Sequence, residues 1–165
     1  MRWEDLADQP CSMARALAVV GDRWTLMILR DAFLKVRRFD DFQKSLGLAR
    51  RVLSERLALL VDEGVLEKRP YQDRPVRYEY RLTDKGLDLY PTVLSLIHWA
   101  DRHYAGPEGP PVLHRHKGCG CDFRSVLSCS ECGKKLKPRQ VEARSNPALD
   151  QSADSLVKRL SDIPA

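Results

Sequence analysis

The stretch from Gly47 to Leu57, GLARRVLSERL, decides the fold of this 165-residue chain. Apolar residues recur at helical spacing from here to Val61, which predicts a helix over 49–63 with one buried face. Its outer face is short and basic near the N-terminal end, and Gly64 is placed to end the helix. The buried stripe consists of Val52, Leu53, Leu57, Leu60 and Val61, and the opposite side carries Arg50, Arg51, Ser54, Glu55 and Ala58.

Three more helices are predicted upstream of this one. A short helix over 39–46 carries Phe39, Phe42 and Leu46 at spacings of three and four residues. Before it, Asp22 is placed to cap a helix running from Arg23 to about Phe33, and residues 11–20 form another helical face. Two helices joined by three or four residues that include a glycine are typical of a helix-turn-helix.

Downstream, two strands are predicted over 65–71 and 76–82, with residues 72–75 at the hairpin tip. Thr83 is placed to cap a last helix, which Pro91 kinks or breaks and which stays apolar to about His103. The predicted fold class is therefore mainly α with a small β-hairpin wing, a winged helix-turn-helix, followed by a small Cys/His-rich, ribbon-like module.

Arginines stand where such a fold meets DNA. Arg50 and Arg51 can fork to guanine, and the small Ser54 lets the helix come close to the bases. Arginines before the short helix can neutralise phosphates, and those beside the hairpin tip suit a narrow minor groove. Ala49 stands where a capping Ser or Thr is expected, which leaves that helix N-terminus free for a phosphate. The predicted DNA contacts are Arg37, Arg38, Arg50, Arg51, Ser54, Arg56, Arg74 and Arg77.

In these motifs the chain resembles the HxlR-type, MarR-like family of bacterial transcription regulators. The resemblance covers residues 11 to about 105 and implies homodimers that bind pseudo-palindromic DNA operators through paired recognition helices. It also implies that the first and last helices form the dimer contact. The matching residues are Cys11, Gly21-Asp22-Arg23-Trp24, Leu29-Arg30, Arg38-Phe39, Val52-Leu53-Ser54-Glu55-Arg56-Leu57, Gly64, Arg69, Pro75, Tyr78-Glu79-Tyr80, Leu82-Thr83-Asp84-Lys85-Gly86 and Trp99.

The function expected from these features is a sequence-specific transcriptional regulator, a dimeric repressor that responds to a redox signal or to another effector. The alternative is a winged-helix and zinc-ribbon module that docks proteins and touches DNA weakly. Any single arginine also fits an ordinary solvated surface, so the prediction depends on the ordered set. An enzyme is not expected, because the four histidines lack a paired acid or nucleophile at a telling spacing.

The five cysteines fall into two groups. Cys11 stands alone at the start of the first helix, where a thiolate is stabilised, and in the redox-sensing branch of the resembled family a cysteine here senses oxidants. The other reading is a small buried apolar residue.

The second group consists of two close pairs, His116 with Cys119 and Cys129 with Cys132, separated by nine residues. Each pair can hold one side of a tetrahedral ion, which predicts one structural Zn²⁺ ion. His114 and Cys121 are alternative ligands, and an Fe–S cluster on the four C-terminal cysteines is a further possibility. Free or redox-active thiols are the competing reading.

Charge and composition divide the chain. The net charge is +5, and residues 112–144 hold eight Lys and Arg against three Asp and Glu. We expect a DNA-binding and dimerisation domain over 11–105, a Gly/Pro linker over 106–111, a zinc ribbon over 112–144 and a disordered tail over 145–165. No apolar run approaches the roughly 18 residues of a membrane span, and no signal peptide is recognisable, so a cytoplasmic location is expected.

Overall fold

The computed structural model describes residues 6–144 and 146. The predicted tail over 145–165, apart from Asn146, lies outside the described residues. The elements are, in chain order, α1 Ser12–Val20, α2 Arg23–Phe33, α3 Phe39–Leu46, α4 Arg50–Asp62, β1 Leu66–Asp73, β2 Val76–Leu82, α5 Asp84–Leu87, α6 Tyr90–Tyr104 and a 3₁₀ turn Pro138–Gln140. In the described part, no helix is long and apolar enough to cross a bilayer.

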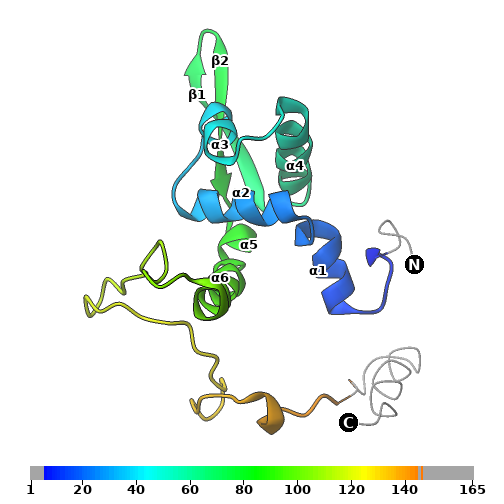
Figure 1. Cartoon of the computed structure of the whole chain (residues 1–165). Helices are drawn as coiled ribbons and strands as arrows, with labels where there is room; N and C mark the ends of the chain where they lie inside the picture. The colour runs from blue at the N-terminus through cyan, green and yellow to red at the C-terminus, as the bar shows by residue number, and fades with distance from the viewer. Residues whose placement is uncertain (1–5, 145, 147–165) are drawn as a thin grey trace.

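Helix α2 lies at the centre of the fold. It runs beneath α3 and α4, with the β1–β2 hairpin projecting above them and α1 and α6 below (Figure 1). One apolar core joins α2, α3, α4 and the start of β1, and its residues are Ile28, Leu29, Ala32, Phe42, Leu48, Leu53, Leu57, Leu60, Val65 and Leu66. The predicted stripe of α4 is confirmed at its three leucines, while Val52 and Val61 are half-buried against the core.

The start of α2 explains the Gly21-Asp22-Arg23-Trp24 segment. The Asp22 carboxylate accepts hydrogen bonds from the backbone N–H groups of Trp24 and Thr25, at 2.9 and 3.3 Å. These bonds satisfy two donors that the first turn of a helix leaves without partners, so the predicted cap is confirmed. The same carboxylate lies 3.3 Å from Nε of Arg56 and so ties α4 to α2.

The wing is an antiparallel hairpin in which Leu66 pairs with Leu82 and Asp73 with Val76. The first strand runs two residues further than predicted, to Asp73, because a bulge at Tyr71 restores the pairing beyond Pro70. The tip is therefore the dipeptide Arg74–Pro75. The segment before α3 forms an isolated bridge to β2 through Arg38 and Glu79, which joins the wing to the helix-turn-helix.

The turn from β2 into α5 is built around Thr83. Its hydroxyl accepts a hydrogen bond from the Gly86 backbone N–H at 3.1 Å and donates one to the Gly64 carbonyl at 2.6 Å. The end of α4 and the start of α5 are thereby joined. The predicted interruption near Pro91 is a break: α5 ends at Leu87, and α6 begins at Tyr90 with the proline in its first turn.

Beyond α6 the chain forms an extension of two short hairpins, drawn in yellow to orange in Figure 1. The extension is attached to α6 through His98, whose Nδ1 accepts a hydrogen bond from the Ser125 backbone N–H at 2.8 Å. Residues 106–109, in the predicted linker, form a tight turn closed by a hydrogen bond from Gly109 N–H to the Gly106 carbonyl.

Candidate nucleic-acid interface

The outer face of α4 carries the predicted base-reading residues. Arg51 is 90% exposed, and its Nε donates to the Glu55 carboxylate at 2.8 Å, one helical turn along. This hydrogen bond and the carboxylate charge raise the pKa of Arg51 above its ordinary value. Ser54 is exposed on the same helix. Both side chains are therefore available to a ligand, and the Arg51 pair is exposed and weak enough to exchange for a base.

Arg50 is exposed but held in place by α3. Its guanidinium lies 4.8 Å from the ring centroid of Phe39, and one nitrogen lies 3.2 Å from the Gln43 side-chain oxygen and 3.4 Å from the Asp40 carboxylate. Four residues from two helices thus share one cluster. These contacts are exposed, so they orient the Arg50 side chain but are weak enough to exchange for a contact with DNA.

The two arginines before α3 lie beside the wing. Arg38 stacks its guanidinium over the Tyr71 ring at 4.4 Å, while the Arg37 carbonyl accepts a hydrogen bond from Tyr80 N–H at 2.7 Å. Burial raises the pKa of Tyr80. Both arginine side chains remain exposed, so they can meet a phosphate on the side where the wing joins α3.

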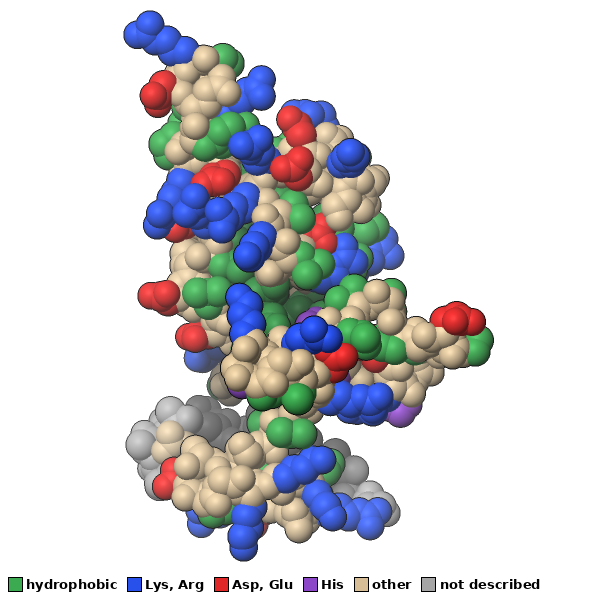
Figure 2. All heavy atoms as spheres, turned by 90° about the vertical axis from the view of Figure 1, so that its left-hand side faces the viewer, with side chains coloured by type: hydrophobic (Ala, Val, Ile, Leu, Met, Phe, Trp, Pro, Cys, Tyr) green, Lys and Arg blue, Asp and Glu red, His purple; other side chains and the backbone are tan. Residues whose placement is uncertain are grey.

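The wing places Arg74 at its tip and Arg77 on β2 opposite Gln72, both exposed. Lys68 lies over the Tyr78 ring, 4.3 Å from its centroid, and adds a cation on the same hairpin. On the face shown in Figure 2, Lys and Arg side chains gather over the hairpin, with acidic groups among them. Because the Arg74 side chain is exposed at the tip, it is free to enter a narrow minor groove of DNA.

A groove of about 430 Å³ separates the start of the helix-turn-helix from the wing. It brings together side chains from α3, the first turn of α4 and both strands. Its basic members face the exposed carboxylates at the start of α3, so part of the positive charge is already neutralised. The lining residues are Arg38, Phe39, Asp40, Asp41, Arg50, Tyr71, Val76, Arg77 and Tyr78.

Arg56 lies apart from the other predicted contacts. Its side chain is 34% exposed and pairs with Asp22 at the start of α2. Within the described residues its Nε is buried and lacks a well-aligned hydrogen bond. The ion pair ties α4 to the cap of α2, so the side chain is already engaged in the fold and its phosphate contact stays a prediction.

Sequence reasoning missed the residues that hold the arginines. Gln43 and Asp40 orient Arg50, and Tyr71 orients Arg38. The contacts of Gln43 and Asp40 could have been predicted, because in a helix-turn-helix the outer face of the first helix lies close to the start of the second. Tyr71 gave no such signal, because the bulge that turns it toward Arg38 is not readable from spacing.

The cysteines lie in two places. Cys11 is half-buried at the cap position of α1, directly before the helix. In the extension, Nδ1 of His116 lies 3.3 Å from Sγ of Cys119. Hydrogen bonds from the backbone of Cys132 and Glu131, with the Cys132 side chain, hold the pKa of Cys129 below its ordinary value.

The predicted zinc ligands are thus brought together in pairs. Among the described residues, no three of the His, Cys, Asp and Glu side chains form a group that could hold a metal ion. The four-residue set therefore stays a prediction.

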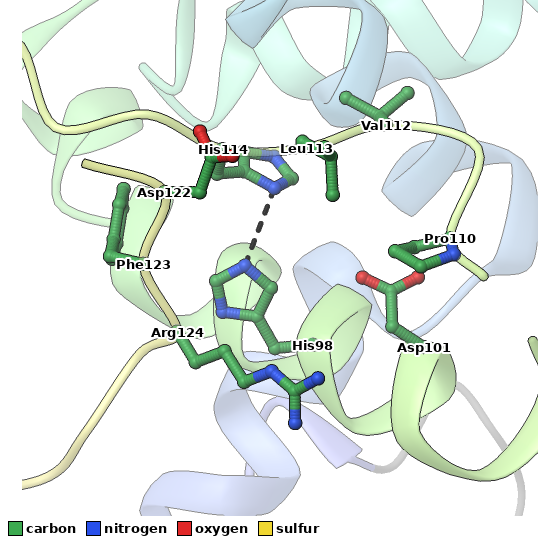
Figure 3. Close-up of a pocket in the computed structure, with 9 residues that line it drawn as sticks. All are labelled: His98, Asp101, Pro110, Val112, Leu113, His114, Asp122, Phe123 and Arg124. Atoms are coloured by element: carbon green, nitrogen blue, oxygen red, sulfur yellow. Dashed lines mark hydrogen bonds between the residues drawn. The ribbon is translucent and has the colours of Figure 1, made fainter. Parts of the chain in front are cut away.

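A second cluster attaches the extension to the domain. His98 of α6 is 4% exposed, and its Nε2 lies 3.3 Å from Nδ1 of His114 (Figure 3). The ring of Phe123 packs edge-on against His98 at 5.9 Å. A cavity of about 280 Å³ lies beside them, lined also by Asp101 and Arg124. Burial, and next the charge of His114, lower the pKa of His98.

The model of the HxlR-like helix-turn-helix family matches residues 19–107 of this chain. The chain belongs to this family. The uncharacterised HTH-type transcriptional regulator Rv3095 of Mycobacterium tuberculosis is 44% identical over 136 residues, which cover 82% of this chain and 86% of the relative. The family match ends at residue 107, and the alignment with Rv3095 covers 136 residues. Because this is more than the chain holds up to residue 107, the alignment also includes part of the C-terminal extension.

Solved structures agree with the fold. The crystal structure of PA1607, a candidate transcription factor, superposes with a TM-score of 0.77 at 34% identity and covers 85% of this chain and 98% of that chain. The redox regulator HypR in its reduced form is similar at 26% identity and a TM-score of 0.52, over 56% of this chain and 92% of that chain.

These findings confirm the resemblance to HxlR-type proteins. The protein is an HTH-type transcriptional regulator of this family, which implies DNA binding and confirms the prediction that it is not an enzyme. The mainly helical winged helix-turn-helix with its β-hairpin is likewise confirmed.

Proposed function

We propose that this HxlR-family regulator is a homodimeric repressor that binds a pseudo-palindromic operator. The observation that carries the proposal is the common exposure of Arg51 and Ser54 on α4 and of Arg74 at the wing tip. A recognition helix and a wing that project from one side of α2 can occupy a major groove and the neighbouring minor groove together (Figure 1).

Dimer formation is supported by α1. The helix has no buried residue, although its sequence SMARALAVV is mostly apolar, and Met13 is 66% exposed. An isolated helix of nine residues is marginal in water, so this one needs a packing partner. The exposed side of α6 adds Leu96, Trp99 and Tyr104. Two copies that pack through α1 and α6 cover these side chains and set the distance between two recognition helices.

A redox or effector response is proposed at the same end of the molecule. Cys11 lies at the start of α1, where oxidation changes the packing of a helix that belongs to the proposed dimer contact. HypR, which is similar in fold, is described as a redox regulator. A shift of α1 alters the angle between two protomers, and hence the spacing of their recognition helices.

Binding of the reduced protein to its own upstream intergenic DNA tests the proposal. Fluorescence anisotropy at two salt concentrations, against a random duplex, gives affinity, stoichiometry and salt slope in one series. We expect sequence-preferring binding at two protomers per site, with affinity that falls steeply with salt.

Weak binding that is equal on both duplexes would instead favour the protein-docking alternative. If binding is sequence-preferring, repression is separated from activation by placing the bound site so that it overlaps a reporter promoter. Occlusion lowers transcription in the presence of the protein, and a rise in transcription contradicts the repressor assignment.

A further inference from the structure

The C-terminal extension contains the same hairpin twice. Residues 114–123 and 127–136 repeat one backbone hydrogen-bond pattern at an offset of 13 residues, as the numbers of the bonded pairs show. Each hairpin also contains one isolated bridge, Arg115 with Asp122 and Ser128 with Lys135, again 13 residues apart. The matching N–H to carbonyl bonds are His116 to Cys121 and Cys129 to Lys134, Gly120 to His116 and Gly133 to Cys129, and Phe123 to His114 and Leu136 to Leu127.

The 13-residue offset places the predicted zinc ligands at equivalent positions of the two hairpins. His116 corresponds to Cys129, and Cys119 corresponds to Cys132, at the two ends of each turn. A glycine follows each second ligand with a positive φ, +71° at Gly120 and +69° at Gly133, a conformation that other residues rarely adopt. The glycine and the backbone hydrogen bonds therefore form the same tight turn in each hairpin, with two predicted ligands in it.

The spacing within a pair suits a shared ion. Zn–N bonds of about 2.0–2.1 Å and Zn–S bonds of about 2.3 Å place two tetrahedral ligands roughly 3.5 Å apart. Nδ1 of His116 lies 3.3 Å from Sγ of Cys119. In the second hairpin, Cys129 N–H donates to the Lys134 carbonyl at 2.9 Å and Gly133 N–H donates to the Cys129 carbonyl at 2.8 Å. Cys129 and Cys132 therefore lie in one tight turn, at the positions that His116 and Cys119 occupy in the first.

The other candidate ligands are engaged elsewhere. Nδ1 of His114 lies 3.3 Å from His98, so its ring belongs to the contact that attaches the extension to α6. Cys121 occupies the position of Lys134 in the repeat, outside the ligand pair, and its Sγ is directed to the Cys119 carbonyl at 3.6 Å. The structural repeat therefore selects one ligand from each end of each turn.

We propose that the two hairpins are the halves of one tetrahedral site for a soft divalent cation, Zn²⁺ in the cell, with His116, Cys119, Cys129 and Cys132 as its ligands. Three thiolates and a neutral imidazole leave one negative charge around Zn²⁺, which the surrounding basic side chains offset. The ligand shell is closed, so the ion holds the module together and activates no water.

Closure of the site requires the hairpins to approach each other, because the two pairs do not form one group in this structure. The link between the repeats is residues 124–126, long enough for one turn. Val126 in this link and Leu127 directly after it are 65% and 71% exposed. Packing the hairpins face to face covers such side chains, so metal binding and folding of the module are coupled.

The test is a titration of the reduced, metal-stripped full-length chain with Co²⁺ alone. Tetrahedral thiolate coordination gives a strong ligand-field band in the visible and a charge-transfer band in the near ultraviolet. We expect both bands to saturate at one Co²⁺ per chain and to disappear on addition of Zn²⁺. Saturation without the charge-transfer band, or no saturation up to one equivalent, would overturn the proposal.

Matched cysteine variants locate the ligands. Cys119→Ser and Cys132→Ser, one in each hairpin, are expected to abolish stoichiometric binding, whereas Cys11→Ser and Cys121→Ser keep one Co²⁺ per chain. Circular dichroism confirms that each variant retains the helical domain. Bands that survive loss of Cys119 or Cys132 would contradict this ligand set. Binding that returns only on mixing a Cys119→Ser with a Cys132→Ser protein would place the halves on different protomers and overturn the single-chain site.

Discussion

The imidazoles of His98 and His114 meet edge-on, 5.0 Å between centroids, and this contact attaches the C-terminal extension to α6. Burial and the neighbouring His114 lower the pKa of His98, with smaller contributions from Arg124 and Arg102 and an opposing one from Asp101. The folded protein thus favours the neutral ring. Because the unfolded chain binds the proton more readily, this contribution to stability is present above the ordinary His pKa of about 6.5 and is lost below it.

The first prediction is that the extension detaches as pH falls from about 7 to about 5. Limited proteolysis between residues 105 and 125 across this range measures it, with intact α6 as the reference fragment. His98→Gln removes the titrating ring and is expected to flatten the pH dependence. His103→Gln changes an exposed histidine five residues further along α6, so it is the matched control and leaves the pH dependence unchanged. A pH dependence that persists in His98→Gln would assign it to another group.

Gly86 supplies the second prediction. A Cβ at this position meets the backbone carbonyl oxygen of Val65 and lies 3.0 Å from the Leu82 side chain, so backbone has to move. Gly86→Ala is expected to cost about 1–3 kcal/mol of unfolding free energy, as other overpacked sites do. Gly106→Ala is the control, since nothing lies within 4 Å of a Cβ there, and we expect a change within about 0.5 kcal/mol. Urea denaturation monitored by circular dichroism measures both, and equal losses would contradict the packing argument.

The element order and the core followed from the sequence because each element carried its own signal. The three leucines of α4, the Asp22 cap and the Gly47 turn are local features, and all three are found. The Thr83 and Gly86 turn is partly local: the cap was predictable, while its bond to Gly64 depends on where α4 ends in space. Long-range packing of this kind cannot be derived from spacing.

The candidate site was less predictable, because side-chain contacts decide it. The sequence predicts a DNA contact for both Arg50 and Arg56. In the structure, Arg50 pairs with Asp40 of α3 on an exposed face, and Arg56 pairs with Asp22 near the core. The two residues lie six positions apart on α4, and this places their side chains against different partners. The same holds for the hairpin repeat of the extension. The spacing of its predicted ligands can be seen in the sequence, whereas the identical hydrogen-bond patterns of the two hairpins are seen only in the structure.

The third prediction separates the two roles of Asp22, as the cap of α2 and as the partner of Arg56. Asp22→Ala removes the acceptor of two backbone N–H groups together with the ion pair, and it is expected to lower stability by about 0.5–2 kcal/mol. Asp22→Asn keeps a capping side chain but loses the charge, so its loss is expected to be smaller. Thermal denaturation of both variants provides the comparison. Equal losses would mean that the cap contributes little and that the Arg56 pair dominates.

The fourth prediction distinguishes base reading from phosphate contact. Arg51→Ala is expected to weaken binding to the operator roughly 10- to 100-fold with little change on random DNA, because a fork to a base is lost. Arg74→Ala is expected to weaken binding to both duplexes and to reduce the salt slope by about one, as one phosphate contact is removed. The same anisotropy assay measures both. If Arg51→Ala instead weakens binding to both DNAs equally, Arg51 is a phosphate contact.

The fifth prediction concerns the apolar face of α1. Leu17→Glu places a charge where the proposed dimer buries a leucine, and burial of an unpaired carboxylate is unfavourable, so we expect a monomer of 18.9 kDa with an intact helical domain. Leu34→Glu is the control, because Leu34 is 58% exposed at the end of α2 and is not among the residues of α1 and α6 that the proposed dimer covers. Sedimentation velocity gives the mass. Operator affinity falls with the dimer, since two half-sites then bind separately. A Leu17→Glu protein that stays dimeric and keeps its operator affinity places the contact on other elements, and the spacing of the recognition helices would then have to be set without α1.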